Sequence, residues 1–219
     1  MAAAAEVPLH EIPERCAEIF SNLVARETTK PHLNYFCPDT ETMPAEVGAG
    51  AYNPEKCLIT QVGCAAVTDG MIEPNNPYSI NVNWIGHRGV PDERTMEELI
   101  EKLRLEIEFK KGIPTGKKYT VTMSRIRSGR LPYDVMNEVY QFVDKRLRAG
   151  YYLVGYNMLR FDIPSMFNNF MRAGVPVDQN TMNQLFDDCQ NNSWDMGLIV
   201  KAAACKMAPW PGESRLAFF

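Results

Sequence analysis

The sequence contains little of what a zinc site or a disulfide framework requires. Its 219 residues include six cysteines, none of them spaced as a CxxC pair, and three histidines. No apolar run reaches about 18 residues, and the N-terminal stretch MAAAAEVPLHEIPER is too broken by Glu, His and Pro to form a signal-peptide core. We therefore expect free thiols and an intracellular protein of the cytoplasm or nucleus that is neither secreted nor inserted in a membrane.

The excess of charge is also small, because 23 Lys and Arg stand against 27 Asp and Glu. A net charge of −4 disfavours a protein that coats nucleic acid through bulk charge, but it is compatible with a locally basic groove. Between residues 110 and 130 there is no acidic residue and there are seven basic ones: Lys110, Lys111, Lys117, Lys118, Arg125, Arg127 and Arg130. Together with Tyr119 they either follow a phosphate backbone or form a solvated loop.

Hydrophobic periodicity predicts one α/β domain. With 45% hydrophobic residues, the chain is long enough for one substantial core. Apolar runs bounded by Gly, Pro and Asn predict strands at 33–40, 57–68, 78–85 and 151–157. Apolar residues at helical spacing predict helices within 1–31, at 93–109, 132–148 and 164–174, and a helix or strand-helix unit at 194–207. Strands followed by helices that alternate with a strand predict a mixed sheet between helices.

Two carboxylates stand two residues apart at the end of the first predicted strand, in YFCPDTET. On a strand, Asp39 and Glu41 share one face, so their charges repel unless water or a cation lies between them. A third carboxylate, Asp162, follows a strand that ends in GYN and precedes a helix with Pro164 in its first turn. Three carboxylates without His or Cys suit Mg²⁺ or Mn²⁺. Alone, a DxE pair is common and Asp162 is compatible with a helix cap; together they are far more specific.

These residues resemble the first two motifs of a known enzyme family. The stretch DTET, with LITQVGCAAV as the strand that pairs with it, looks like the first motif of the DnaQ-like, or DEDD, 3′–5′ exonucleases. GYNMLRFDIP looks like the second motif, whose Asp is a metal ligand. The segment from Asn191 onward resembles the segment after that motif in bacterial exonuclease I-like enzymes. The resemblance covers roughly 33–219, and part of 86–118 looks like an addition.

The resemblance implies a ribonuclease H-like fold, a mixed five-stranded sheet flanked by helices, in a domain of 32–219 that follows an N-terminal helical extension of 1–31. It implies that nucleotides are removed from the 3′ end of a nucleic acid, preferably single-stranded, by two-metal hydrolysis that releases 5′-mononucleotides. Asp39, Glu41 and Asp162 are then the catalytic residues that hold two Mg²⁺ or Mn²⁺ ions, and Asp195 is a further candidate ligand. Substrate contacts are expected from six residues: Thr40, Thr42, Met43, Asn157, Arg160 and Phe161.

The family's third motif, HxxxxD or YxxxD, supplies a fourth carboxylate and a general base. Only 24 residues follow Asp195, and none is His or Tyr. The stretches 87–92 and 140–144 have the required spacing, but both precede the second motif. We expect a domain truncated at its C-terminus, a degenerate and inactive enzyme, or a site completed by groups from elsewhere, such as a protein partner.

Two alternatives use the same scaffold. One is a catalytically inactive module that binds nucleic acid or protein. The other is the proofreading domain of a family B DNA polymerase, because NPEKCLITQVGCAAV and VGYNMLRFDIP also resemble its first two motifs. DNA and RNA substrates both stay open, since that choice depends on 2′-OH contacts that no motif here specifies.

Overall fold

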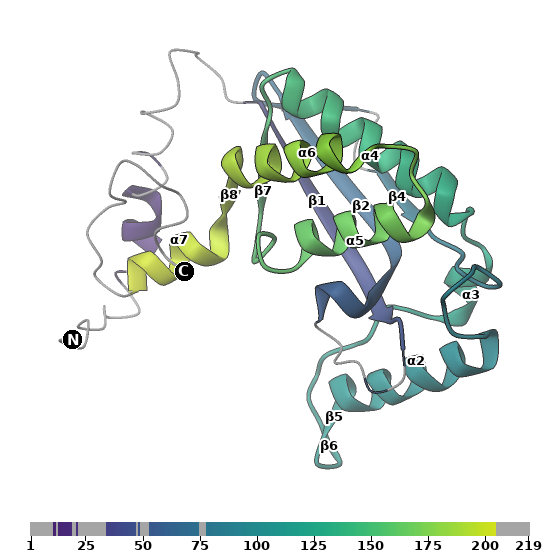
Figure 1. Ribbon diagram of the computed structural model, residues 1–219. Helices are drawn as coiled ribbons and strands as arrows, with labels where there is room; N and C mark the ends of the chain where they lie inside the picture. Colours follow the sequence, from purple (N-terminus) through teal and green to yellow (C-terminus); the bar gives the residue numbers. More distant parts are fainter. Residues whose placement is uncertain are drawn as a thin grey trace, which may run out of the picture.

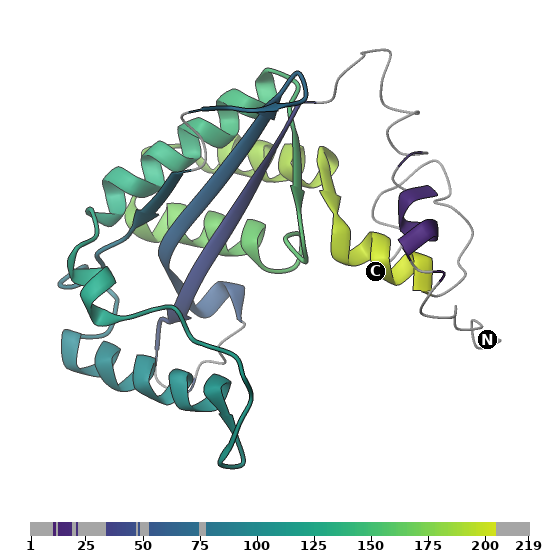
Figure 2. The same cartoon turned by 180° about the vertical axis from the view of Figure 1, so that it is seen from behind.

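A mixed sheet forms the centre of the protein. The computed structural model describes residues 34–46, 53–74 and 78–204, together with residues 11, 13–18, 21 and 48. Helices α4, α5 and α6 cover one face of the sheet: they lie in front of it in Figure 1 and behind it in Figure 2. The six strands of the sheet are β1 (Tyr35–Pro44), β2 (Cys57–Thr68), β3 (Met71–Ile72), β4 (Tyr78–Asn81), β7 (Tyr152–Gly155) and β8 (Ser193–Asp195).

The strand order is β3-β2-β1-β7-β8, and β4 also pairs with β2. β1 and β2 are antiparallel, whereas β1, β7 and β8 run parallel to one another. The expected mixed sheet flanked by helices is confirmed. It contains six strands rather than five, because β3 and β4 pair with two different stretches of β2, at 67–68 and 61–64.

The helices begin and end at signals that the sequence carries. They are α2 (Glu93–Glu108), α3 (Met123–Arg127), α4 (Pro132–Arg148), α5 (Asp162–Ala173), α6 (Gln179–Asn191) and α7 (Met196–Ala204), with a 3-10 turn η2 at Pro54–Lys56. Asp92 caps α2 by accepting the N–H of Thr95 at 2.8 Å, and Gly174 ends α5 in the left-handed region at φ 76°. The helices predicted at 93–109, 132–148 and 164–174 are therefore confirmed, whereas α6 was not predicted.

Other predicted segments differ from the structure or fall partly outside its described residues. The segment after α2 forms a small hairpin of β5 (Phe109–Lys110) and β6 (Ile113–Pro114), which was not predicted. The predicted strand at 78–85 ends at 81, and the unit at 194–207 begins with β8 and continues as α7. Residues 13–18 are helical, but most of 1–31 and all of 205–219 lie outside the described part, so the extension as a separate unit stays a prediction. No described helix is long and apolar enough to span a membrane.

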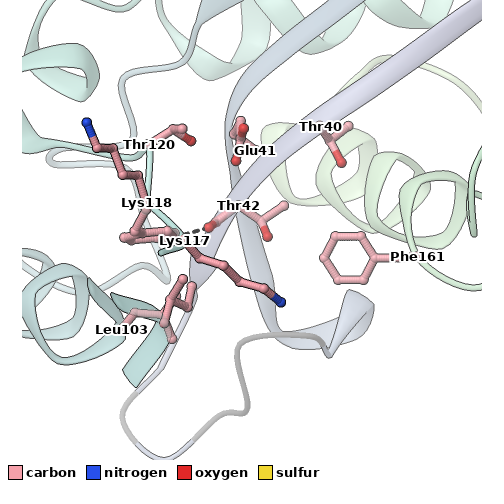
Figure 3. Close-up of a pocket in the computed structure, with 10 residues that line it drawn as sticks. Thr40, Glu41, Thr42, Leu103, Lys117, Lys118, Thr120 and Phe161 are labelled. Carbon is pink, nitrogen blue, oxygen red and sulfur yellow. Dashed lines mark hydrogen bonds between the residues drawn. The ribbon is translucent and has the colours of Figure 1, made fainter. Parts of the chain in front are cut away.

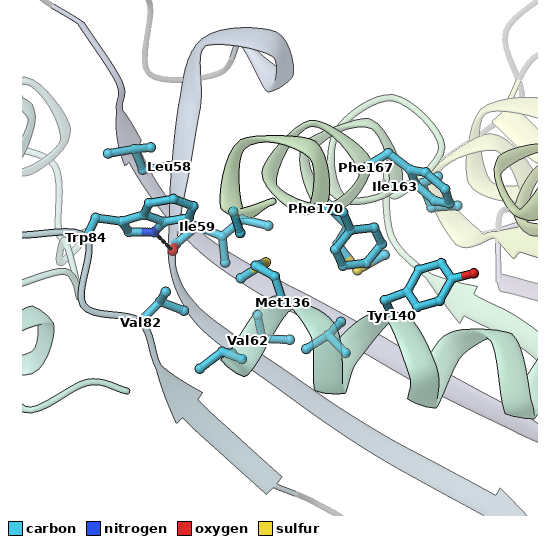
Figure 4. Close-up of a cluster of buried hydrophobic side chains, with 14 of the residues drawn as sticks. Leu58, Ile59, Val62, Val82, Trp84, Met136, Tyr140, Ile163, Phe167 and Phe170 are labelled. Atoms are coloured by element: carbon cyan, nitrogen blue, oxygen red, sulfur yellow. Dashed lines mark hydrogen bonds between the residues drawn. The ribbon is translucent and has the colours of Figure 1, made fainter. Parts of the chain in front are cut away.

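The core lies between the sheet and the helices α4 and α5 (Figure 4). α4 contributes a stripe at spacings of three and four residues: Val135, Met136, Val139, Tyr140 and Val143. Tyr140 meets Phe170 of α5 edge to face, with 5.9 Å between ring centroids. Trp84 is fully buried, and its Nε1–H donates to the carbonyl oxygen of Ile59 at 2.7 Å. This packing fixes α5, and with it the strand-to-helix corner at Asp162.

Candidate active site

A β-bulge interrupts the pairing of β1 and β2 beside the predicted carboxylates. The register shifts between Glu41 and Thr42, which leaves Thr60 as the extra residue of β2. Thr60 is only 3% exposed, and its hydroxyl donates to the carbonyl oxygen of Glu41 at 3.0 Å. A side chain therefore helps to hold the backbone of the DxE segment at the point where the regular ladder is broken.

A buried asparagine ties α5 to β2 next to this bulge. Asn169 is fully buried, and its Oδ1 accepts the N–H of Ile59 at 3.0 Å. Its Nδ2 donates to the carbonyl oxygen of Cys57 at 3.2 Å and to that of Ser165 at 2.8 Å. One amide group thus satisfies backbone groups of both elements and fixes the helix that begins with Asp162. Asn169 was not among the residues predicted from the sequence.

The structure brings Asp162 to β1, and the direct contact is with Thr40. Thr40 is 9% exposed, and its Oγ1–H donates to Asp162 Oδ1 at 2.5 Å. Asp39 and Glu41 alternate with Thr40 along the strand, with Asp39 exposed and Glu41 half-buried. The first and second predicted motifs therefore meet through one short hydrogen bond between residues that are 122 positions apart in the chain.

Electrostatics sets Asp162 apart from an ordinary surface carboxylate. The pKa of Asp162 is raised to about 6: burial is the largest cause, the hydrogen bond from Thr40 opposes it, and the charge of Asp39 adds to the rise. A divalent cation near Asp39 and Asp162 would relieve both the desolvation and the repulsion.

The three predicted ligands fit a metal by their chemistry more closely than by their arrangement. Carboxylate oxygens are the ligands that Mg²⁺ and Mn²⁺ prefer, and Asp39 is near enough to act electrostatically on Asp162. Within the described part of the chain, however, no group of three His, Cys, Asp or Glu side chains is placed to hold a metal ion. Of the three ligands, Asp39 and Asp162 are thus the pair that the structure couples.

Asp195, the further candidate ligand, is bound by backbone groups. It is 4% exposed at the end of β8. Its Oδ1 accepts the N–H groups of Asn157 (2.7 Å) and Gly197 (2.9 Å), and its Oδ2 accepts the N–H of Leu159 (3.1 Å). Two of these bonds go to the loop between β7 and α5 and the third to the first turn of α7, so Asp195 holds the loop that leads to Asp162.

Three of the predicted substrate contacts occupy this loop or its end. Asn157 has a left-handed backbone at φ 59°, and its carbonyl oxygen accepts the N–H groups of Arg160 (3.3 Å) and Phe161 (3.2 Å). Asn157 and Arg160 are exposed, and Phe161 is half-buried. The prediction for Met43 needs correction, because its side chain is 0% exposed and belongs to the core. The three consecutive residues 42–44 at the end of β1 are all buried.

A cavity of about 440 Å³ lies next to the DxE segment (Figure 3). One side is formed by β1 and by Phe161, and the other by α2 and the segment 117–120. Ten residues line it: Thr40, Glu41, Thr42, Leu103, Ile107, Lys117, Lys118, Tyr119, Thr120 and Phe161. The two sides are joined by the Tyr119 hydroxyl, which donates to the carbonyl oxygen of Thr42 at 2.8 Å. The predicted contacts Thr40, Thr42 and Phe161 therefore share one cavity with Glu41.

The basic segment 110–130 divides into parts with different surroundings. Arg127 forms ion pairs with Glu93 (2.7 Å) and Glu97 (3.3 Å), and Arg130 pairs with Glu138 at 2.8 Å. Lys117 and Lys118 instead line the cavity. Of the seven basic residues in this segment, only Lys117 and Lys118 line the cavity.

Comparisons with known proteins place this geometry in a familiar fold. No protein-family model and no curated protein matches the sequence. Among solved structures, the metal-free complex of E. coli exonuclease I with single-stranded DNA is similar over 78% of this chain and 30% of its own, at 14% identity and a TM-score of 0.50. The E. coli enzyme with a dA16 oligonucleotide is similar over 78% of this chain and 29% of its own, at 15% identity and a TM-score of 0.49. A product-bound exonuclease I is similar over 78% of this chain and 31% of its own, at 17% identity and a TM-score of 0.49.

The similarity to the metal-free complex, at a TM-score of 0.50, shows the fold. The chain has a mixed α/β fold of the ribonuclease H-like type found in exonuclease I. It spans less than a third of the length of those exonuclease I chains.

Proposed function

We propose that this chain contains a 3′–5′ exonuclease domain, which hydrolyses phosphodiester bonds at the 3′ end of a single-stranded nucleic acid and releases 5′-mononucleotides. The observation that carries the proposal is the 2.5 Å hydrogen bond from Thr40 to Asp162, which joins the two carboxylate motifs at one corner of the sheet. The shared fold supports it, and so does the single-stranded DNA present in the metal-free exonuclease I complex.

In this proposal Asp39, Glu41 and Asp162 hold Mg²⁺ or Mn²⁺. When bound, two such ions activate the attacking water and stabilise the leaving oxygen. The rigid strand β1 presents Asp39 and Glu41, while Thr40 orients Asp162 through its hydroxyl. Partial burial of Asp162 strengthens its attraction for a cation, because charges interact more strongly where water is excluded.

The direct test is cleavage of a 5′-labelled single-stranded 20-mer in Mn²⁺, with release of mononucleotides as the second readout. We expect the wild type to shorten the strand from its 3′ end, and Asp39→Asn to lower the rate by roughly 100-fold or more, because it removes a carboxylate ligand. Asp187→Asn makes the same chemical change at an exposed position of α6 and should cleave like the wild type. Absence of cleavage by the wild type, or equal cleavage by Asp39→Asn, would overturn the proposal.

A second candidate is a nucleic-acid-binding module without hydrolysis. One observation favours it: within the residues that the structure describes, no three metal-ligating side chains are grouped. This candidate predicts that the oligonucleotide binds with the same affinity in Mn²⁺ and in EDTA and stays intact in both.

A further inference from the structure

We propose that the cavity between β1 and α2 is a nucleotide subsite, in which Lys117 binds a phosphate and the apolar wall receives the base of a single strand. The proposal rests on the proposed function for its choice of ligand. It assigns a role to the segment 93–120, part of which has no counterpart in the resemblance to DnaQ-like exonucleases.

The cavity has walls of two chemical kinds. Leu103 and Ile107 of α2 supply an apolar wall on one side and the ring of Phe161 supplies apolar surface on the opposite side, whereas Lys117 and Lys118 supply ammonium groups. A nucleotide has the matching halves, a base with a π face and an anionic phosphate. The cavity volume of about 440 Å³ falls within the range of about 300–1,000 Å³ that is usual for small-ligand sites.

The wall that carries the lysines is held in place by the rest of the fold. The Tyr119 hydroxyl donates to Thr42 O at 2.8 Å, and the Tyr119 N–H donates to Glu108 Oε1 at 3.3 Å. Glu108 is itself bound by Arg104 at 2.7 Å. The segment 117–120 is thus connected both to β1, which bears the carboxylates, and to the end of α2. Such support from neighbouring residues is what a binding site needs to keep its shape before the ligand arrives.

The side chains of the two lysines point in different directions, so Lys118 can serve as a control for Lys117. In Figure 3 the Lys117 side chain extends past Thr42 on the side of Phe161, whereas the Lys118 ammonium points away from Phe161. A phosphate on the Phe161 side of the cavity would therefore meet Lys117 first. The ligand is a single strand, since a base reaches an apolar wall only when it is unstacked from its neighbours and unpaired.

The test measures binding in EDTA, so that it does not depend on hydrolysis. Anisotropy of a fluorescein-labelled single-stranded 10-mer is recorded over a salt series for the wild type and for Lys117→Gln, Lys118→Gln and Lys110→Gln/Lys111→Gln. We expect Lys117→Gln to weaken binding roughly tenfold at low salt and to reduce the slope of log K against log salt by about 0.7, the value for one phosphate contact on a single strand.

The remaining variants serve as controls. Lys118→Gln should have the smaller effect, and the double variant in the β5–β6 hairpin, outside the cavity, should leave the slope unchanged although it removes two charges. A 10-mer with abasic sites at its 3′ end should bind the wild type more weakly, because it lacks the base that contacts the apolar wall. Equal weakening by all lysine variants, or equal binding of the abasic strand, would overturn the subsite.

These outcomes separate the subsite from the proposed nuclease. If the wild type binds through Lys117 but does not cleave in Mn²⁺, the nuclease proposal fails and the subsite is retained. If the wild type cleaves while Lys117→Gln and the hairpin variant behave alike in binding, the subsite fails and the nuclease proposal is retained.

Discussion

Two neighbouring strand-to-helix corners each place an aspartate at the same loop. The surroundings of one aspartate stabilise its charge, whereas those of the other destabilise it. At the end of β8, Asp195 accepts three backbone N–H groups. At the start of α5, Asp162 accepts the hydroxyl of Thr40, and burial raises its pKa to about 6. A carboxylate surrounded by donors stabilises the fold, whereas a desolvated carboxylate beside another acid reduces stability and is ready for a cation. The difference indicates that Asp195 has a structural role and that Asp162 is the better candidate for a metal ligand.

The largest effect is expected at Asp195. Asp195→Ala leaves two N–H groups of the loop and one of α7 without their acceptor, so the free energy of unfolding should fall by about 3–5 kcal/mol, as for other broken buried networks. Asp195→Asn keeps one acceptor oxygen and should lose less, about 2 kcal/mol. Urea unfolding in EDTA measures both. If Asp195→Ala unfolded at the wild-type urea concentration, the structural role of Asp195 would be wrong.

Substitution of Asp162 should change the free energy of unfolding in the opposite direction, toward higher stability. The folded-state pKa of about 6 lies above the ordinary value of 3.8, so the native state holds its proton longer than the unfolded state does. Wild-type stability contributed by this group therefore decreases as pH rises from about 4 to about 6 and stays lower above that range. Asp162→Asn should be more stable than the wild type by about 1–3 kcal/mol at pH 7 and nearly equal to it near pH 4.

The measurement for Asp162 is chemical unfolding of both proteins in EDTA across this pH range, with Asp187→Asn as the exposed control. The same Asp162→Asn protein should lose Mn²⁺-dependent cleavage. A variant that is less stable than the wild type at every pH would contradict the account of Asp162 as a strained, desolvated acid.

A smaller effect is expected at Gly197, where an added Cβ atom would be in tight contact with its neighbours. A Cβ atom there would lie 3.0 Å from Asp195 Oδ1 and 3.3 Å from the backbone N of Asn157. Gly197→Ala should therefore push the carboxylate away from the loop and cost about 1–2 kcal/mol of unfolding free energy. Hydrogen exchange of the Asn157 and Leu159 amides, followed by NMR, should accelerate more than exchange in α4. Uniform acceleration would show that the loop is not held at this point.

The smallest change is expected from Thr40→Val, which keeps the shape of the side chain and removes the hydroxyl. Because the hydrogen bond from Thr40 lowers the pKa of Asp162, its loss should raise that pKa further. We expect about 1 kcal/mol lower stability at pH 8 and a smaller loss at pH 4, where the carboxyl is protonated. The pH profile of cleavage should shift to higher pH. Thr181→Val, which alters a helix cap on α6, gives a control that should leave the pH profile unchanged.

Much of the scaffold was predictable, because its signals are local. Periodicity located β2 and α4 with the bounds that the structure shows, and the DxE pair and Asp162 were found from residue type and position at the ends of predicted strands. α6 was not predicted, because its segment, Gln179–Asn191, is mostly polar and buries only three residues. A helix of that kind depends on tertiary packing more than on its own pattern.

The details of the candidate site were not predictable, because they depend on contacts between distant residues. Met43 is fully buried in the core, and no feature of the sequence around it signals this. Asn169 offered one weak signal, an amide within the apolar stripe of α5, but its partner Ile59 is 110 positions away. The division of the basic segment likewise depends on where Glu93, Glu97 and Glu138 lie in space.

The hydrogen bond between Thr40 and Asp162 also has a consequence for folding kinetics. Contacts across 122 positions require closure of a long loop before they contribute any stability, so they form after the local helices and hairpins. During synthesis from the N-terminus, β1 and β2 emerge well before α5, and β1 is paired on only one edge until β7 is made. The nascent chain therefore exposes an open edge of β1, and the start of that edge, at Tyr35 and Phe36, is paired only when β7 emerges, just before the second motif.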